Sequence, residues 1–143
     1  MKVEGILRSK GTNVVTVNPS ATVGSIVQRL HQERIGAMVV TENGRVLGMI
    51  SERDVIRGLA DHGPAILDRQ VADLMTRLVH SCSRDDSVKH LMSEMTRKRI
   101  RHLPVIDDGV LCGIVSIGDV VKNRLEEVEM EANVLRDAYI ART

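Results

Sequence analysis

The sequence predicts a mixed α/β (α+β) fold in which a strand-helix-strand-strand-helix unit occurs twice and a long helix follows. Three observations support this prediction. The chain aligns with itself without a gap when it is shifted by 65 residues. Short β-branched segments alternate with segments of helical periodicity in both copies. No proline or glycine follows Gly118. Neither copy is large enough to bury its own sheet face well, so we expect them to pack as one pseudo-two-fold module.

The repeat pairs residues 14–59 with residues 79–124. Some of the paired residues are identical, and many others are both apolar. The absence of any gap over this length argues against chance similarity. An internal repeat of this kind decides the architecture of a chain. Identical pairs include Val14/Val79, Val23/Val88, Arg34/Arg99, Gly48/Gly113, Ser51/Ser116 and Asp54/Asp119.

Each copy begins with a short strand and a helix. In the first copy, residues 14–17 form the strand, residues 19–22 form a turn, and Thr22 is placed to cap the helix. Apolar residues then follow at i, i+3, i+4 and i+7, which is typical of one helix face. These residues are Val23, Ile26, Val27 and Leu30 in the first copy, and Val88, Leu91, Met92 and Met95 in the second.

A hairpin and a second helix complete each copy. Strands over residues 37–41 and 46–50 flank Asn43-Gly44, a favoured type I′ turn, and Asp108-Gly109 takes this place in the second copy. Ser51 then begins a helix.

Two lead-in segments, residues 3–8 and 71–76, are predicted to form short helical turns, and residues 58–70 to connect the copies. The last helix runs from Ile117 to about Ala141. It carries a seam with heptad spacing, which fits either a coiled coil or an ordinary amphipathic helix packed on its own domain. The seam consists of Val121, Leu125, Val128, Ala132, Leu135 and Tyr139.

Composition excludes several classes of function. The net charge of +1 gives no general attraction to nucleic acid or to an anionic membrane. Tyr139 is the only aromatic residue, so a stacking surface for single strands is missing. No apolar run approaches the roughly 20 residues of a membrane span, and the N-terminus lacks the apolar core of a signal peptide. We therefore expect a cytoplasmic protein with no nucleic-acid or membrane partner.

Catalytic and metal-binding motifs are also missing, and we expect neither an enzyme nor a metal site. His80 and Cys82 could ligate a metal, but the first copy has valines at the equivalent positions, so strand positions explain them better. Cys82 and Cys112 match no zinc pattern. Both align with apolar strand positions, so we expect two reduced, buried thiols.

The segment Gly48–Asp54 ends a strand and opens a helix. A helix N-terminus offers N–H groups and positive potential to a phosphate. Ser51 can donate to a ribose or phosphate oxygen, and Asp54 can accept from two ribose hydroxyls, as acidic residues do in dinucleotide folds. Ser-x-x-Asp is also close to a capping box, which stabilises a helix without any ligand. The two roles can coexist.

Each copy of the repeat resembles a cystathionine β-synthase-type (CBS) motif, and the two copies in tandem resemble a Bateman module. The resemblance rests on the repeated fold, the lead-in Val-x-Asp-Leu-Met-Thr at residues 71–76, and Gly-φ-φ-Ser-x-x-Asp (φ, apolar) in both copies. It implies CBS motifs in residues 1–62 and 63–125 and a helical extension over 126–143. It also implies a regulatory module that senses an adenosyl ligand such as AMP, ATP, NADH or S-adenosylmethionine.

The same resemblance implies two unequal pockets, each shared between motifs. Basic residues before the second strand, Arg101 and His102, would reach phosphate, whereas Arg97 to Arg99 suit the end of a helix. The first pocket would consist of Met49, Ser51, Arg53, Asp54, Val79, Arg101 and His102. The second would consist of Ile114, Ser116, Asp119, Val14, Gly36 and Ala37, and would lack the two cations. We expect a phosphorylated nucleotide, most readily AMP, to prefer the first pocket.

CBS pairs commonly form two-fold discs through the helices after each third strand, so the resemblance implies a homodimer that modulates a partner protein. The sequence does not identify that partner. The alternative interpretation is a dimeric interaction module that binds no ligand.

Overall fold

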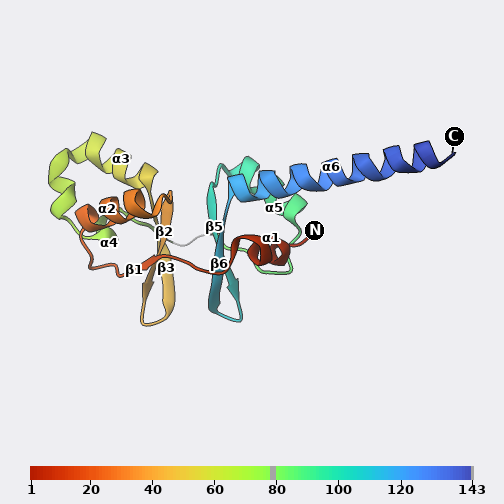
Figure 1. Ribbon diagram of the computed structural model, residues 1–143. Coiled ribbons are helices and arrows are strands. Elements are labelled where there is room, and N and C mark those ends of the chain that lie inside the picture. Colours follow the sequence, from red (N-terminus) through yellow and green to blue (C-terminus); the bar gives the residue numbers. More distant parts are fainter. Residues whose placement is uncertain (78–79, 143) are drawn as a thin grey trace. The chain divides into compact units, whose positions relative to one another are not determined.

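The computed structural model describes residues 1–77 and 80–142 (Figure 1). The chain forms two compact units, each of which contains most of one copy of the repeat. The first-copy unit comprises Asn13–Ser81 and Ile106–Cys112. The second-copy unit comprises Met1–Thr12, Cys82–Val105 and Gly113–Thr143. The predicted mixed α+β class is confirmed.

The first copy forms a four-stranded sheet with the order β1-β2-β3-β4. Strand β1 is parallel to β2, and the other neighbours are antiparallel. Figure 1 shows α2, α3 and α4 on the same side of the β2–β3 hairpin. The elements are β1 (Thr16–Val17), α2 (Val23–Glu33), β2 (Ala37–Glu42), β3 (Arg45–Ser51), α3 (Glu52–His62), the 3-10 helix η1 (Pro64–Asp68), α4 (Val71–Leu74) and β4 (Thr76–Arg77).

Local signals position α2 as predicted. The Thr22 hydroxyl oxygen accepts a hydrogen bond from the Ser25 N–H at 3.2 Å, which satisfies one of the N–H groups at the start of the helix. The predicted apolar face of α2 then packs into an aliphatic core with residues of both hairpin strands, β2 and β3, and of η1. This core contains Val17, Val23, Ile26, Leu30, Met38, Val40, Ile50, Val55, Ile66 and Val71.

The second copy forms a two-stranded sheet, and among the described residues of its predicted first strand Cys82 forms a bridge with Val105. Figure 1 shows α1, α5 and α6 on one side of the β5–β6 hairpin. The elements are α1 (Val3–Lys10), α5 (Val88–Lys98), β5 (His102–Asp107), β6 (Val110–Ser116) and α6 (Ile117–Arg142). Buried residues include Val3, Leu7, Val88, Leu91, Met95, Val115 and Val120.

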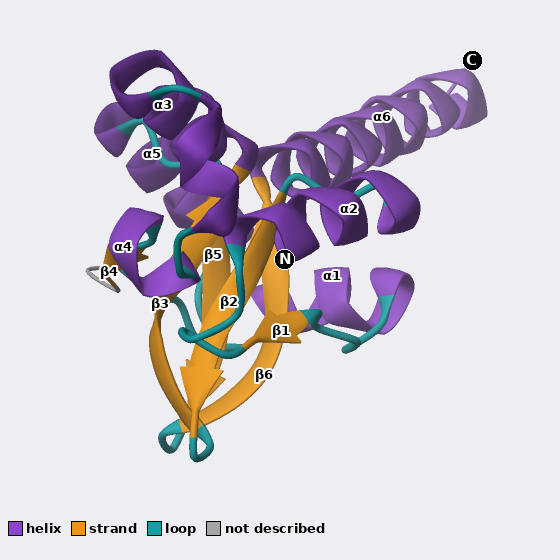
Figure 2. Cartoon of the chain, turned by 90° about the vertical axis from the view of Figure 1, so that its left-hand side faces the viewer, coloured by secondary structure: helices purple, strands orange, loops and turns teal. Residues whose placement is uncertain are grey.

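The hairpin turns have the geometry that the sequence predicts. Asn43 and Gly44 have φ angles of 51° and 77°, and Asp108 and Gly109 have 50° and 75°. Positive φ at both central residues defines the type I′ turn, whose twist matches that of the flanking strands. Figure 2 shows the tight loop that joins each pair of strands.

The two lead-in segments occupy equivalent places on different copies. The Val71 N–H donates to the Ala21 carbonyl at 2.8 Å, and the Val3 N–H donates to the Asp86 carbonyl at 2.9 Å. Ala21 and Asp86 are equivalent in the repeat. Helix α1 therefore packs on the second copy, although it precedes the first copy in the sequence.

Glycines in the third strand make room for these lead-ins. A Cβ on Gly48 would lie 2.2 Å from the Thr76 carbonyl oxygen, and one on Gly113 would lie 2.6 Å from Leu7 Cδ2. The Gly48/Gly113 identity in the repeat is explained by this close approach, because any side chain would collide with the segment packed across the strand.

Three expectations need correction. Helix α3 continues to His62, four residues past Gly58, because Gly58 lies within the helix and lets Leu74 approach it. Thr76 lies in strand β4, not in a helical turn, because it pairs with Met49. Cys82 is buried as predicted, but Cys112 is only half-buried because it lies near the exposed end of the β5–β6 hairpin.

Among the described residues, no helix is long and apolar enough to cross a membrane.

We predict that Gly48→Ala destabilises the protein more than Gly113→Ala does. The new methyl group at residue 48 meets a backbone oxygen, whereas at residue 113 it meets the end of a leucine side chain that can rotate. Overpacking costs about 1–3 kcal/mol, and we expect the upper end of this range for Gly48→Ala and the lower end for Gly113→Ala. Urea unfolding of both variants measures the difference, and equal or reversed losses would contradict the packing described above.

Candidate functional site

The first candidate site lies where β3 ends and α3 begins. The Ser51 hydroxyl oxygen accepts from the Asp54 N–H at 3.4 Å, and the Ser51 N–H donates to Asp54 Oδ2 at 2.9 Å. This reciprocal pair is the predicted capping box, which is therefore confirmed. It holds the carboxylate of Asp54 in the first turn of the helix, where the positive end of the helix dipole favours an anion.

Asp54 is a buried charged residue, with 8% of its surface exposed. Its other oxygen, Oδ1, accepts from the Thr76 hydroxyl at 3.0 Å. Thr76 is brought there by strand β4, which pairs with β3 so that Thr76 lies opposite Met49. Arg57 lies 3.9 Å from Oδ1, but its side chain is mostly exposed. The groups that donate hydrogen bonds to this carboxylate are therefore uncharged, and Arg57 adds a longer ion pair at the surface.

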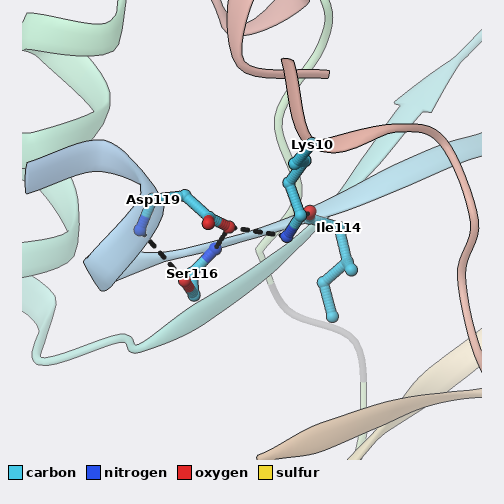
Figure 3. A network of polar contacts seen from close by, with 4 residues as sticks. All are labelled: Lys10, Ile114, Ser116 and Asp119. Atoms are coloured by element: carbon cyan, nitrogen blue, oxygen red, sulfur yellow. Dashed lines mark hydrogen bonds and ion pairs between the residues drawn. The ribbon is translucent and has the colours of Figure 1, made fainter. Parts of the chain in front are cut away.

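The equivalent site in the second copy has the same backbone geometry. The Ser116 N–H donates to Asp119 Oδ2 at 2.9 Å, and the Ser116 hydroxyl oxygen accepts from the Asp119 N–H at 3.1 Å (Figure 3). Lys10, at the end of α1, adds a charged partner. Its ammonium group donates to Asp119 Oδ2 at 2.6 Å and to the Ile114 carbonyl at 3.0 Å. The two candidate sites thus differ in the charge of their partners.

The environment of Asp119 changes its pKa. Partial burial raises the pKa of this carboxyl, but hydrogen bonds from Lys10 and from the Ser116 backbone outweigh burial, and the pKa lies below its ordinary value of 3.8. Asp119 is therefore ionised throughout the neutral range, and its charge is matched by the Lys10 ammonium group.

Other residues predicted for the sites flank the same junctions. Met49 and Ile114 are half-buried on the third strands, while Arg53 is exposed. Ala37 lies opposite Ser51 in the β2–β3 register. The Gly36 carbonyl accepts from the Glu52 N–H at 3.0 Å, so residues 36 and 37 lie beside the site of their own copy. Val14 is half-buried and precedes β1.

Arg101 and His102 hold the equivalent place in the second copy. The Arg101 carbonyl accepts from the Ile117 N–H at 2.8 Å, and His102 is the first residue of β5. Arg101 is exposed and His102 is half-buried. They belong to the other unit from Asp54, so the shared pocket stays a prediction. Val79 lies outside the described residues.

Part of the remaining basic cluster is paired with an acidic residue. Arg97 and Lys98 lie in the last turn of α5 and pair with Glu94, Lys98 at 2.8 Å. Hydrogen bonds from Lys98 and Arg97 lower the pKa of Glu94 to about 2. These contacts agree with the prediction that Arg97 and Lys98 serve the end of the helix.

Sequence reasoning missed Thr76 and Lys10 as site residues. Thr76 was noted only as part of a lead-in motif, and Lys10 lies 109 residues from Asp119 in the chain. Thr76 belongs to a lead-in motif that the sequence marks, whereas no local pattern connects Lys10 with Asp119. Within the part of the chain that the structure describes, no group of three or more His, Cys, Asp or Glu side chains could hold a metal ion.

Residues 3–61 and 71–126 match the CBS domain family, so each match contains one copy of the repeat. The chain belongs to the CBS domain family. A solved CBS-domain containing protein from Agrobacterium tumefaciens is 44% identical, with a TM-score of 0.84 over 87% of this chain and 99% of that chain.

Two further CBS domain proteins are also similar. The mitochondrial CBS domain-containing protein CBSX3 of Arabidopsis thaliana is 34% identical over 148 residues, which cover 96% of this chain and 71% of that protein. A CBS domain protein from Pyrobaculum aerophilum, solved in complex with AMP, is 26% identical, with a TM-score of 0.73 over 83% of this chain and 89% of that chain. The resemblance found in the sequence motifs is confirmed.

We predict that Lys10→Met raises the pKa of Asp119 toward the ordinary value. A carboxyl whose pKa is lowered by folding adds stability above its unfolded pKa and loses it as the pH falls through the folded pKa. As the pH falls below about 4, the free energy of unfolding should therefore decrease more in the wild type than in Lys10→Met. Carbon-13 NMR titration of the Asp119 carboxyl measures the shift, and an ordinary pKa in the wild type would show that the ion pair does not form in solution.

Proposed function

We propose that this chain is a regulatory module that binds an adenine nucleotide and modulates a partner protein. The observation that carries the proposal is the buried Asp54 carboxylate, held at a helix start by Ser51 and Thr76. A carboxylate in this place can accept from ribose hydroxyls while the helix N-terminus and Ser51 face the phosphate. The AMP complex of the Pyrobaculum relative supports an adenosyl ligand.

In this proposal the first pocket combines Asp54, Ser51 and Met49 with Arg101 and His102 of the other motif. Cations that donate to phosphate make some of the stronger hydrogen bonds. AMP is the favoured ligand, with ATP and NADH as the other candidates, and neither a metal nor a reaction is part of the proposal. The nucleotide would act by population shift, because it favours whichever arrangement of the motifs binds it better.

We predict that Asp54→Ala weakens AMP binding by roughly tenfold or more, because a charge-assisted hydrogen bond contributes about 1.5–3 kcal/mol. Asp119→Ala should leave the tight site nearly unchanged. Calorimetry on the full chain measures both, and Asp54→Asn, which keeps the shape of the side chain, controls for loss of the capping box. Loss of tight binding in Asp119→Ala but not in Asp54→Ala would reverse the assignment.

A thermal-shift panel of AMP, ADP, ATP, NADH and S-adenosylmethionine separates the proposal from its alternative. A ligand that binds only the folded protein raises its melting temperature. If none of the five does so, the chain is better described as an interaction module without a ligand. The exposed face of α6 is the observation that favours this second candidate.

Helix α6 carries the predicted heptad seam on its exposed surface. Leu125, Leu135 and Tyr139 are 58%, 72% and 71% exposed, and Val120 is the buried residue of the helix. A contiguous apolar stripe of this kind marks an interaction surface. We propose that a second copy of the chain covers it.

Charges beside the seam support a parallel, in-register pair of α6 helices. In a parallel coiled coil the residue before one core position faces the residue five places later on the partner helix. Arg124 would then face Glu129 of the other copy, and Glu131 would face Arg136. Both pairs have opposite charge. Within one chain Arg124 pairs with Glu127 at 3.2 Å, so dimerisation would exchange one partner for another.

We predict that Leu135→Asp weakens the dimer by roughly 100-fold or more. Each copy buries one leucine, and each is expected to contribute about 1.5–3 kcal/mol. Val134→Asp is the matched control, because Val134 is an exposed apolar residue of α6 outside the seam. Light scattering and sedimentation measure the change. A monodisperse monomer of the wild type at micromolar concentration, or equal effects of both variants, would contradict the proposed dimer.

A further inference from the structure

Lys10 is the last residue of α1, and its side chain lies in the second candidate site, at Asp119. Its ammonium group donates to Asp119 Oδ2 at 2.6 Å and to the Ile114 carbonyl at 3.0 Å, so it bridges the third strand and the first turn of the helix after it (Figure 3). The side chains of Lys10 and Asp119 are 34% and 25% exposed. This ion pair is thus partly shielded from water, where electrostatic attraction is stronger than on an open surface.

The position of Lys10 is fixed by the helix that carries it. Helix α1 is attached to the second copy by hydrogen bonds from the Val3 and Glu4 N–H groups, at 2.9 and 3.0 Å. Leu7 packs where Gly113 has no side chain. Exposed ion pairs contribute little because two mobile side chains must be ordered. At Lys10 this cost is smaller, because the attachment of α1 to the second copy already holds the backbone of Lys10 near Asp119.

In the first copy the cation near Asp54 is more distant and more exposed. The Asp54 Oδ1 oxygen accepts from the neutral Thr76 hydroxyl at 3.0 Å, and the guanidinium of Arg57 lies 3.9 Å away on a side chain that is mostly exposed. A ribose hydroxyl can exchange with a neutral hydroxyl at little cost. It cannot readily replace an ammonium group, because displacing Lys10 would separate opposite charges in a place partly shielded from water, where their attraction is stronger than on an open surface.

We propose that Lys10 determines which CBS motif accepts a nucleotide, by occupying Asp119 and so closing the second site. The inference rests on the proposed function, in which Asp54 and Asp119 are the acceptors for ribose. A nucleotide entering the second site has to displace the ammonium group from Asp119 and from the carbonyl of Ile114. The first site therefore fills at a lower concentration, and the second stays closed until Lys10 moves away.

The test measures AMP binding at the second site in a variant whose first site is weakened. Asp54→Asn removes the carboxylate of the first site, and Lys10→Met in that background keeps the apolar stem of the side chain but removes its charge. Calorimetry on the full chain should show AMP binding at least tenfold tighter in the double variant than in Asp54→Asn. Adding Asp119→Asn should remove the gain. An equal or weaker affinity in the double variant, or a gain that survives Asp119→Asn, overturns the inference.

Arg8→Met in the Asp54→Asn background is the matched control. Arg8 lies on the same helix, and its exposed side chain pairs with Glu4 at 3.6 Å. This variant lowers the net charge by the same amount and should leave AMP binding unchanged. A gain equal to that of Lys10→Met would attribute the effect to net charge and overturn the role of Lys10. Amide NMR spectra of each variant confirm that the fold is kept.

The two proposals fail in distinguishable ways. If the wild type binds AMP, Asp54→Asn removes that binding and Lys10→Met adds nothing, the proposed function stands and the role of Lys10 falls. If neither the wild type nor any variant binds AMP or another nucleotide of the panel, both fall. Tight binding in the wild type together with a gain in the double variant supports both.

Discussion

A lead-in segment packs closely against the glycine of each third strand, and this contact positions both candidate sites. At Gly48 the approaching group is the Thr76 carbonyl, and at Gly113 it is the Leu7 side chain. At Gly48 the contact requires a residue without Cβ, because a methyl group would meet a backbone oxygen, whereas at Gly113 it would meet the end of a side chain that can rotate. The same contacts deliver the side chains that complete the sites. Thr76 reaches Asp54, and Lys10, three residues after Leu7, reaches Asp119.

The serine and aspartate at each strand end serve folding and, in the proposed function, ligand binding with the same atoms. Asp54 and Ser51 satisfy each other's backbone N–H groups, and a capping interaction of this kind contributes about 1 kcal/mol to stability. The carboxylate is thereby fixed in position before any ligand arrives. Preorganisation of this kind lowers the entropy cost of binding. A residue pair that looks purely structural can therefore also be the pre-formed half of a binding site.

The sequence predicted the elements of the fold well because their signals are local. Thr22 and Ser51 cap helices within four residues, and Asn43-Gly44 determines its own turn. The length of α6 follows from the lack of glycine and proline after Gly118. The partners of the site could not be predicted in the same way. Lys10 meets Asp119 only because α1 packs on the copy that it does not precede, and no local pattern encodes that choice. Likewise, Gly58 was expected to begin the connector between the copies, but it lies within α3, where it lets Leu74 approach the helix.

The difference between the two sites arises outside the repeated residues. Ser51 and Asp54 are identical to Ser116 and Asp119, and both pairs have the same backbone hydrogen bonds. What differs is the group that each lead-in supplies, a hydroxyl in one copy and an ammonium in the other. The lead-ins lie outside the gapless alignment, so they can change without disturbing the core that both copies must share. A duplicated fold can in this way keep two equal frameworks and still present two chemically different sites, because the charge that distinguishes them is carried by a segment that packs on the repeat without belonging to it.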